Sequence, residues 1–380
     1  MTIYNIIELF FLLLLLIEIK KPNHKHRNLL YFLCTLTLVI VLGLRNYDVG
    51  GDTPGYCDFF NGDPSGFYGS LYDKQSEIEI GFIYFTRLLK FIIDDWRWFI
   101  FATSVVTLIP FLWATKKYAI NVTFAFVSFM LTFNLIFLVQ TPIRQDIAIS
   151  LFIIGSYILL KEMKKDKKRT FIIVVSLFIL VWGIFTHTTM YLVAPIAIGV
   201  YFLDFTKKAS IIAILSTISL SVLIKSLFSY VFDYLYHITI AYNIFDNVNR
   251  YYDNDNYELT DENTILIIGP LTFVALITIL LSSKEQIKSY LFKCYIIAVC
   301  IMNISVSFPL ASRVGLFFSL IAASFVPQKI NSLYRNNKKE DLLVYALFLF
   351  YILLANRHYN MCRNFKTVLD SDILPYSFWL

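Results

Sequence analysis

The sequence predicts an all-α polytopic membrane protein with about 12 transmembrane helices. Two observations predict this class. Hydrophobic residues make up 58% of the 380 residues and charged residues only 16%, whereas a soluble domain usually carries about 25% charged residues. The apolar residues also gather in runs close to the roughly 20 residues that one membrane crossing needs. A soluble enzyme, a secreted module and a DNA-binding protein are therefore excluded.

Each apolar run predicts one helix of a single membrane domain that covers residues 1–380. In chain order, the expected helices are 2–19, 29–44, 96–115, 119–140, 146–160, 171–186, 189–205, 209–227, 264–282, 289–308, 314–328 and 341–356. The first run has neither a basic start nor a small-residue cleavage site. We therefore expect a membrane helix there and not a removed signal peptide.

Lysine and arginine set the expected orientation. They cluster in alternate connections, such as Lys20–Arg27 and Lys161–Arg169, which indicates that these connections face the cytoplasm. The net charge of +6 arises largely from these clusters. Because the sequence holds no nucleic-acid-binding motif and no basic groove with interleaved aromatic residues, we expect no nucleic-acid partner.

Two longer loops are expected on the opposite, extracytoplasmic side, at about 45–95 and 228–263. Both loops are acidic and rich in aromatic residues. Carboxylates accept hydrogen bonds from hydroxyl groups, and aromatic rings offer apolar faces, so such loops suit sugars. Within the first loop, residues 80–93 are too few to span a membrane. We expect an amphipathic helix there, lying in the outer interface.

The first candidate site follows the second expected helix. The segment Gly43–Tyr56 combines several glycines with Arg45, Asp48 and Asp52. Arg45 can hold a phosphate through two parallel hydrogen bonds. Asp52 can accept a proton or pair with Arg45. A turn stabilised by one ion pair is the structural alternative.

The second candidate site opens the fifth expected helix with Arg144, Gln145 and Asp146. A helix N-terminus attracts anions through its free N–H groups and its dipole. A cation at that end therefore calls for an anion beside it. Either Asp146 or an anionic ligand can fill that role.

Two further candidates are His187 and Arg313. His187 ends an expected helix and can serve as a general acid or base, or as a donor to an oxyanion; an interfacial hydrogen bond is the alternative. Arg313 lies between two late apolar runs, where a charge near the membrane edge indicates function. The alternative is that its long side chain reaches the interface.

These cationic groups are expected together at the outer membrane border, where they suit a lipid-linked phosphate or pyrophosphate. The sequence holds no Walker loop, no GxSxG and no HExxH. An ATP-driven pump, an α/β-hydrolase and a zinc protease are therefore disfavoured. We expect no metal and no cofactor.

Several short motifs occur in a recognisable order. They are Gly43-Leu-Arg45, Gly51-Asp52 with Tyr56, Glu79-Ile-Gly81-Phe, Ile143-Arg144-Gln145 with Ala148, His187 and Arg313. In these residues, spread over about 45–320, the sequence resembles the EpsG-like, Wzy-type polysaccharide polymerases. Where that family usually has a small hydroxyl residue and another small residue after the histidine, this chain has the bulkier Thr188-Thr189-Met190.

The resemblance implies a GT-C-like helical fold and a glycosyltransferase of the bacterial inner membrane. Such a polymerase joins oligosaccharide repeat units carried on undecaprenyl pyrophosphate, at the extracytoplasmic face, for O-antigen, capsule or exopolysaccharide. Arg45, Arg144, Gln145 and Arg313 would bind pyrophosphate and glycan. His187 or Asp52 would accept the proton of the attacking hydroxyl. Membrane lipid, a chain-length regulator and a flippase of the same pathway are the expected partners.

Two other functions share this substrate. One is a flippase or transporter of lipid-linked oligosaccharide, and the other is a related O-antigen ligase-type transferase. Transporters place charges near the bilayer midplane, whereas the apolar runs of this chain are nearly free of charges in their middles. The pattern therefore favours an active site at the interface.

Overall fold

A computed structural model describes most of the first half of the chain and parts of the second. The described residues are 3–20, 24–50, 52–66, 68–72, 78–118, 143–221, 275–280, 282–287, 289–305 and the short pieces 122–123, 126–127, 223, 272, 314–315 and 317–318. Within these ranges the chain forms helices, turns and loops, without a strand.

The described helices divide between two compact units, which are considered separately. The first unit contains Met1–Ile196 and the second contains Ala197–Ala322. Helices α1 (Ile3–Lys20), α2 (His24–Gly43), α3 (Thr53–Asn61), α4 (Ile80–Ile92), α5 (Trp96–Tyr118), α8 (Ile143–Met163) and α9 (Thr170–Thr186) belong to the first unit. Helix α10 (Met190–Phe202) runs across the division, and α14 (Lys284–Ile287) and α15 (Tyr290–Ser305) belong to the second unit.

Among the described helices, three are long and apolar enough to cross a membrane. Their apolar windows are His26–Gly43, Trp96–Trp113 and Ile143–Met163. Shorter apolar helices cover Leu9–Glu18, Thr170–Thr186, Met190–Phe202 and Phe292–Ile304. The chain is therefore a helical membrane protein, whereas the count of about 12 spans and the GT-C-like arrangement stay predictions.

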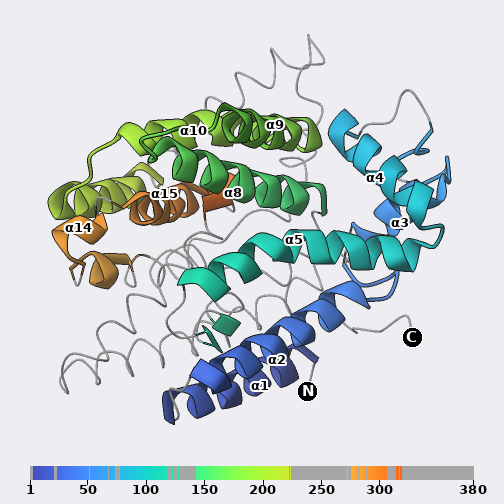
Figure 1. The fold of residues 1–380 in the computed structure, drawn as a ribbon, viewed down its shortest axis with the longest axis horizontal. Helices are drawn as coiled ribbons and strands as arrows, with labels where there is room; N and C mark the ends of the chain where they lie inside the picture. Colours follow the sequence, from blue (N-terminus) through green and yellow to red (C-terminus); the bar gives the residue numbers. More distant parts are fainter. Residues whose placement is uncertain are drawn as a thin grey trace. The chain divides into compact units, whose positions relative to one another are not determined.

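In the first unit, α2 packs on α5, α5 on α8, and α8 on α9, as Figure 1 shows. Small residues bring these helices close together. A Cβ on Gly155 of α8 would lie 3.2 Å from the carbonyl oxygen of Ser176 on α9. At one end of the α2–α5 pair, Arg27 Nη2 donates to the Lys116 carbonyl at 3.3 Å. The basic start of α2 and the basic end of α5 therefore share a side, as the charge pattern predicts.

The opposite end of this unit carries an aromatic core built by α3 and α4. Tyr56 and Phe60 of α3 are buried, and the Phe60 ring stacks on Phe99 of α5 with centroids 4.6 Å apart. The Tyr56 and Tyr68 rings stack at 4.8 Å. Each buried ring of this kind stabilises the fold by roughly 1.5–3 kcal/mol. This core fixes α3 and α4 over the ends of α5 and α8.

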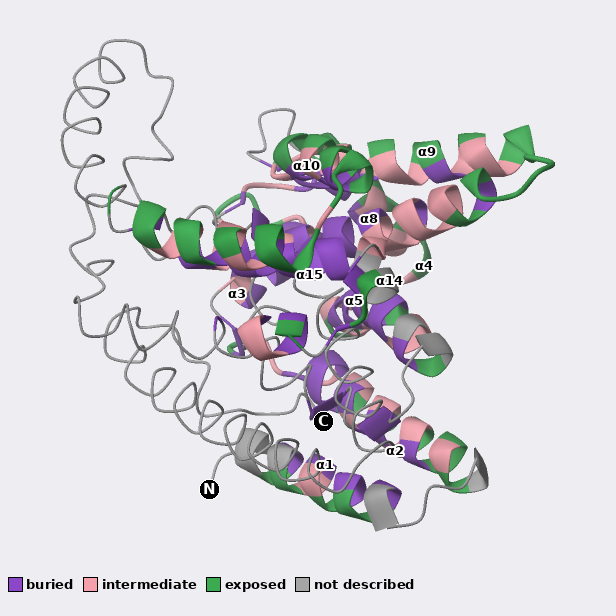
Figure 2. Ribbon diagram, turned by 90° about the vertical axis from the view of Figure 1, so that its left-hand side faces the viewer, coloured by how far each residue is buried: buried purple, intermediate pink, exposed green. Residues whose placement is uncertain are grey.

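The α8–α9 connection is a short, exposed, basic loop, seen beside α9 in Figure 2. The buried Glu162 carboxylate organises it by accepting a hydrogen bond from the Arg169 N–H at 2.8 Å and pairing with Lys165. At the other end of α9, a tight turn leads into α10. That turn holds His187.

In the second unit, polar side chains join its helices internally. Asn303 of α15 accepts a hydrogen bond from Thr272 Oγ1 at 3.2 Å and donates one to Thr217 Oγ1 at 3.3 Å. Buried amide and hydroxyl groups of this kind bind apolar helices together where water is scarce.

The expected helices at 2–19, 29–44, 96–115, 146–160, 171–186, 189–205 and 289–308 are confirmed within a few residues. The helix expected within 80–93 is also present, as α4. Helix α3 was not predicted, because its nine residues read as part of a loop. The helix expected at 341–356 and the loop at 228–263 lie outside the described residues. Those expected at 119–140, 209–227, 264–282 and 314–328 lie partly or mostly outside them.

Candidate functional site

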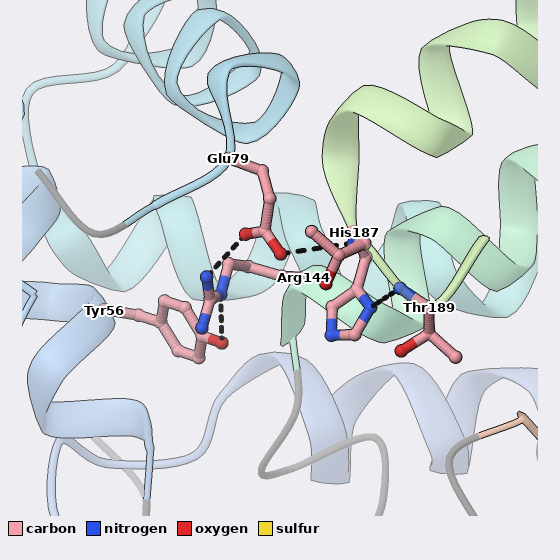
Figure 3. A network of polar contacts seen from close by, with 6 residues as sticks. Tyr56, Glu79, Arg144, His187 and Thr189 are labelled. Carbon is pink, nitrogen blue, oxygen red and sulfur yellow. Dashed lines mark hydrogen bonds and ion pairs between the residues drawn. The ribbon is translucent and has the colours of Figure 1, made fainter. Parts of the chain in front are cut away.

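Arg144 stands in the first turn of α8 and is the centre of a polar network (Figure 3). Its Nε donates to the Tyr56 hydroxyl at 3.1 Å, and its Nη1 pairs with Glu79 Oε2 at 2.5 Å. The guanidinium carbon lies 5.0 Å from the centroid of the Tyr68 ring. Side chains that lie 88 and 65 residues earlier in the chain therefore fix this cation.

The Arg144–Glu79 pair is neither buried nor fully solvated. The Arg144 side chain is 18% exposed and that of Glu79 is 16% exposed. Such a charge pair keeps part of its hydration while water screens it less than at an open surface. The Arg144 side chain is therefore partly open to solvent, and an anion bound there would compete with the carboxylate for it.

Glu79 supplies the anion that a cation at the start of α8 calls for. Glu79 is the N-cap residue of α4, yet its side chain makes no capping hydrogen bond to that helix. An N-cap side chain usually accepts a hydrogen bond from the first turn of its own helix. Here the carboxylate instead reaches Arg144 and the turn after α9.

The two tyrosines around Arg144 keep their phenolic protons at neutral pH. Burial raises the pKa of Tyr56; the Arg144 charge lowers it and the Asp52 charge raises it. Burial also raises the pKa of Tyr68, and the Asp52 charge adds to this rise. The Asp52 charge therefore favours the protonated form of both phenols. The Tyr56 hydroxyl can accept from Arg144 and still donate its own proton.

His187 ends α9 and is tied to the same network. The next residue, Thr188, donates its backbone N–H to Glu79 Oε1 at 3.3 Å. The backbone N–H of Thr189 donates to Nδ1 of the His187 ring at 3.1 Å. His187 is 7% exposed. Glu79 thus bridges the start of α8 and the turn between α9 and α10.

Arg45 lies in a separate, fully buried cluster. It is 0% exposed, and its Nη1 donates to the Leu42 carbonyl at 2.7 Å and to Ser104 Oγ at 3.1 Å. Its positive charge also acts on the buried Asp146 of α8. The described contacts of Arg45 and Arg144 therefore belong to two separate clusters.

Comparison with known proteins decides the family. The family model for the EpsG family matches residues 28–378, nearly the whole chain. The chain belongs to the EpsG family. No curated protein and no solved structure matches it. Membership marks this protein as a membrane protein of polysaccharide biosynthesis, and it confirms the resemblance seen in the short motifs.

The structure brings part of the predicted EpsG family site together. Arg144 and the turn that holds His187 meet through Glu79, and the charge of Asp52 acts on the pKa of the two tyrosines beside Arg144. Gln145 is buried beside Arg144. Arg313 lies outside the described residues.

Glu79 and Tyr56 were not predicted as site residues. Their one signal in the sequence was their presence in motifs shared with the family. Among the described residues, no group of three or more His, Cys, Asp or Glu side chains is placed to hold a metal ion.

Proposed function

We propose that this EpsG family protein is a polysaccharide polymerase that joins undecaprenyl-pyrophosphate-linked oligosaccharide repeat units. The observation that carries the proposal is the Arg144 guanidinium, partly exposed at the start of α8 and held by Glu79 and Tyr56. A cation in that place, next to a helix N-terminus and a histidine turn, suits a diphosphate bound during glycosyl transfer.

The proposed reaction is a displacement at the anomeric carbon of the growing chain. A sugar hydroxyl of the next lipid-linked unit attacks that carbon, and the bond to the lipid diphosphate breaks. Negative charge grows on the departing diphosphate. Arg144 would stabilise this charge, and removing such a preorganised donor typically costs about 10²–10³-fold in kcat.

The proposed place is the outer face of the bacterial inner membrane. Arg27 and Lys116 lie at the end of the α2–α5 pair away from the aromatic core of α3 and α4. The positive-inside rule puts that basic end in the cytoplasm. The site at the start of α8 then opens on the extracytoplasmic side, where a flippase would deliver the substrate and a chain-length regulator would act.

The test is the length of surface glycan in a strain that lacks the gene and carries a variant copy. Arg144→Ala should leave single repeat units on the surface and abolish long chains. Arg144→Lys should restore little, because an ammonium does not form the paired hydrogen bonds of a guanidinium. Arg97→Ala is the matched control, since Arg97 is a half-exposed arginine of α5 that pairs with Asp95.

Other surface-glycan results would contradict the proposed polymerase function. A complete loss of surface glycan would indicate a flippase. Unattached lipid-linked polymer would indicate a ligase. Long chains from Arg144→Ala at wild-type protein levels would remove Arg144 from the site.

A further inference from the structure

The hydrogen bond at Nδ1 fixes which nitrogen of His187 carries the proton. The donor is the backbone N–H of Thr189, which has a hydrogen to give and no lone pair to accept one. Nδ1 must therefore present its lone pair. A neutral imidazole carries its one proton on the other nitrogen, so His187 presents Nε2–H.

The backbone on both sides holds this arrangement in place. His187 ends α9 in an extended conformation, with φ −156° and ψ 128°. Its N–H donates to the Gly183 carbonyl at 3.1 Å, and its carbonyl accepts from the Met190 N–H at 3.1 Å. The same turn then donates Thr188 N–H to Glu79, which is paired with Arg144.

A general base needs a lone pair aimed at the proton it takes. The Nδ1 lone pair of His187 accepts from the chain itself, and Nε2 carries the proton. Glu79 is the acidic group tied both to the His187 turn and to Arg144. Asp52, in contrast, acts on the tyrosines beside Arg144. The sequence predicts His187 and Asp52 as candidate bases. Glu79 is a third candidate, and it contacts both Arg144 and the His187 turn directly.

We propose that Glu79 accepts the proton of the attacking hydroxyl and that His187 donates Nε2–H to the diphosphate. This inference rests on the proposed polymerase function. The hydroxyl oxygen forms the new bond to the anomeric carbon, and the bond from that carbon to the diphosphate oxygen breaks. The bonding electrons leave with the diphosphate, which Arg144 and His187 stabilise. The hydroxyl proton passes to Glu79, which the diphosphate has released from Arg144.

The first test compares His187 variants of the purified protein in nanodiscs. The substrate is the lipid-linked repeat unit isolated from cells that lack the gene. His187→Ala should lose about 10²–10³-fold in kcat, the usual effect of removing a donor to a developing anion. His187→Gln should regain at least about tenfold of that loss, because its amide N–H reaches about as far as Nε2–H.

The matched control is His187→Asn, whose shorter amide reaches only as far as Nδ1 and should not restore activity. The acid limb of kcat/KM against pH should persist in His187→Gln, because the base is elsewhere. If His187→Ala, His187→Gln and His187→Asn lose kcat equally and the acid limb of kcat/KM is gone in His187→Gln, the proposal is overturned and His187 is the base.

Glu79→Gln separates a base from a group that only holds Arg144. The variant keeps an oxygen for the Thr188 N–H but loses the carboxylate. We expect kcat to fall about 10²-fold or more, as for loss of a general base, with little change in KM. A rise in KM at unchanged kcat would overturn the assignment.

The second test does not depend on activity. In ¹⁵N-histidine-labelled protein, the His187 signals are identified by their loss in His187→Ala. They should show an unprotonated Nδ1 and a protonated Nε2 at neutral pH. A protonated Nδ1 would refute the inference even in an active polymerase. If the wild-type protein elongates no glycan while this tautomer is found, the proposed function fails and the tautomer stands.

Discussion

Gly81 of α4 and Phe185 of α9 meet backbone to backbone. A Cβ built on Gly81 would lie 2.6 Å from the carbonyl carbon and 2.7 Å from the carbonyl oxygen of Phe185. Real Cβ atoms essentially never come that close to another atom, and backbone atoms cannot rotate aside. This contact sets how near the start of α4 can come to the His187 turn, and thus whether Glu79 reaches Arg144.

Gly81→Ala should therefore weaken the site without touching a ligand. The new methyl group pushes α4 from α9 and pulls Glu79 from Thr188 N–H and Arg144. A misplacement of about 1 Å can cost about 10²-fold in rate, so we expect a loss of that order in chain elongation. Gly199→Ala is the control, because nothing lies within 4 Å of a Cβ at Gly199. Equal activity in the two variants, at equal expression, would show that the contact does not position Glu79.

Tyr56→Phe should weaken substrate binding more than it weakens the fold. The phenyl ring keeps the stacking on Tyr68, whereas the hydroxyl that accepts from Arg144 Nε is lost. A hydrogen bond to a charged group contributes about 1.5–3 kcal/mol, so KM should rise by roughly tenfold or more. Tyr31→Phe serves as control, since the Tyr31 hydroxyl donates to the Leu112 carbonyl instead. An unchanged KM in Tyr56→Phe would mean that Tyr56 does not orient Arg144.

Arg45→Ala should act on stability before it acts on catalysis. Arg45 is fully buried, and its Nη1 donates to the Leu42 carbonyl at 2.7 Å and to Ser104 Oγ at 3.1 Å. Removing this donor takes a hydrogen-bond partner away from its buried acceptors, which typically costs about 1–3 kcal/mol. The thermal unfolding midpoint of the purified protein in detergent should fall strongly.

Arg45→Ala with wild-type stability and a raised KM would instead support the pyrophosphate role that the sequence predicts for Arg45. That role stays a prediction.

We expect the folded protein to lose stability at alkaline pH because of Tyr47. Burial and the hydrogen bond that Tyr47 donates to Asp58 raise its pKa to about 12, from 10.0. The folded state therefore holds this proton more tightly than the unfolded state. Its contribution is present below about pH 10 and is lost as the pH rises towards 12. The thermal midpoint of Tyr47→Phe should fall less steeply over that range than that of the wild type; parallel curves would contradict this.

The apolar helices were predictable because each leaves a long run in the sequence. Helix α5 was expected at 96–115 and is found at Trp96–Tyr118. Helix α3 was not, because its Pro54 and Gly55 indicate a turn. It forms because Pro suits the first helical turn, Gly62 ends it with a positive φ of 80°, and its aromatic residues fill the core between α4 and α5.

The site was predictable only in part. Arg144 stood out because a cation is unusual at the start of a helix. Its anion, Glu79, lies 65 residues earlier in the chain, and neither periodicity nor charge pattern brings two such residues together. The direction of the His187 ring depends on one hydrogen bond within its own turn, which residue types alone do not reveal.

The most direct test of the central claim is chain elongation by the purified protein itself. Wild-type protein in nanodiscs receives lipid-linked repeat units, without nucleotide sugar and without the other proteins of the pathway, and product length is measured. The account predicts a ladder of longer lipid-linked glycans from the wild type and from Arg97→Ala, and single units only from Arg144→Ala. An equal ladder from Arg144→Ala, or none from properly folded wild-type protein, would contradict it.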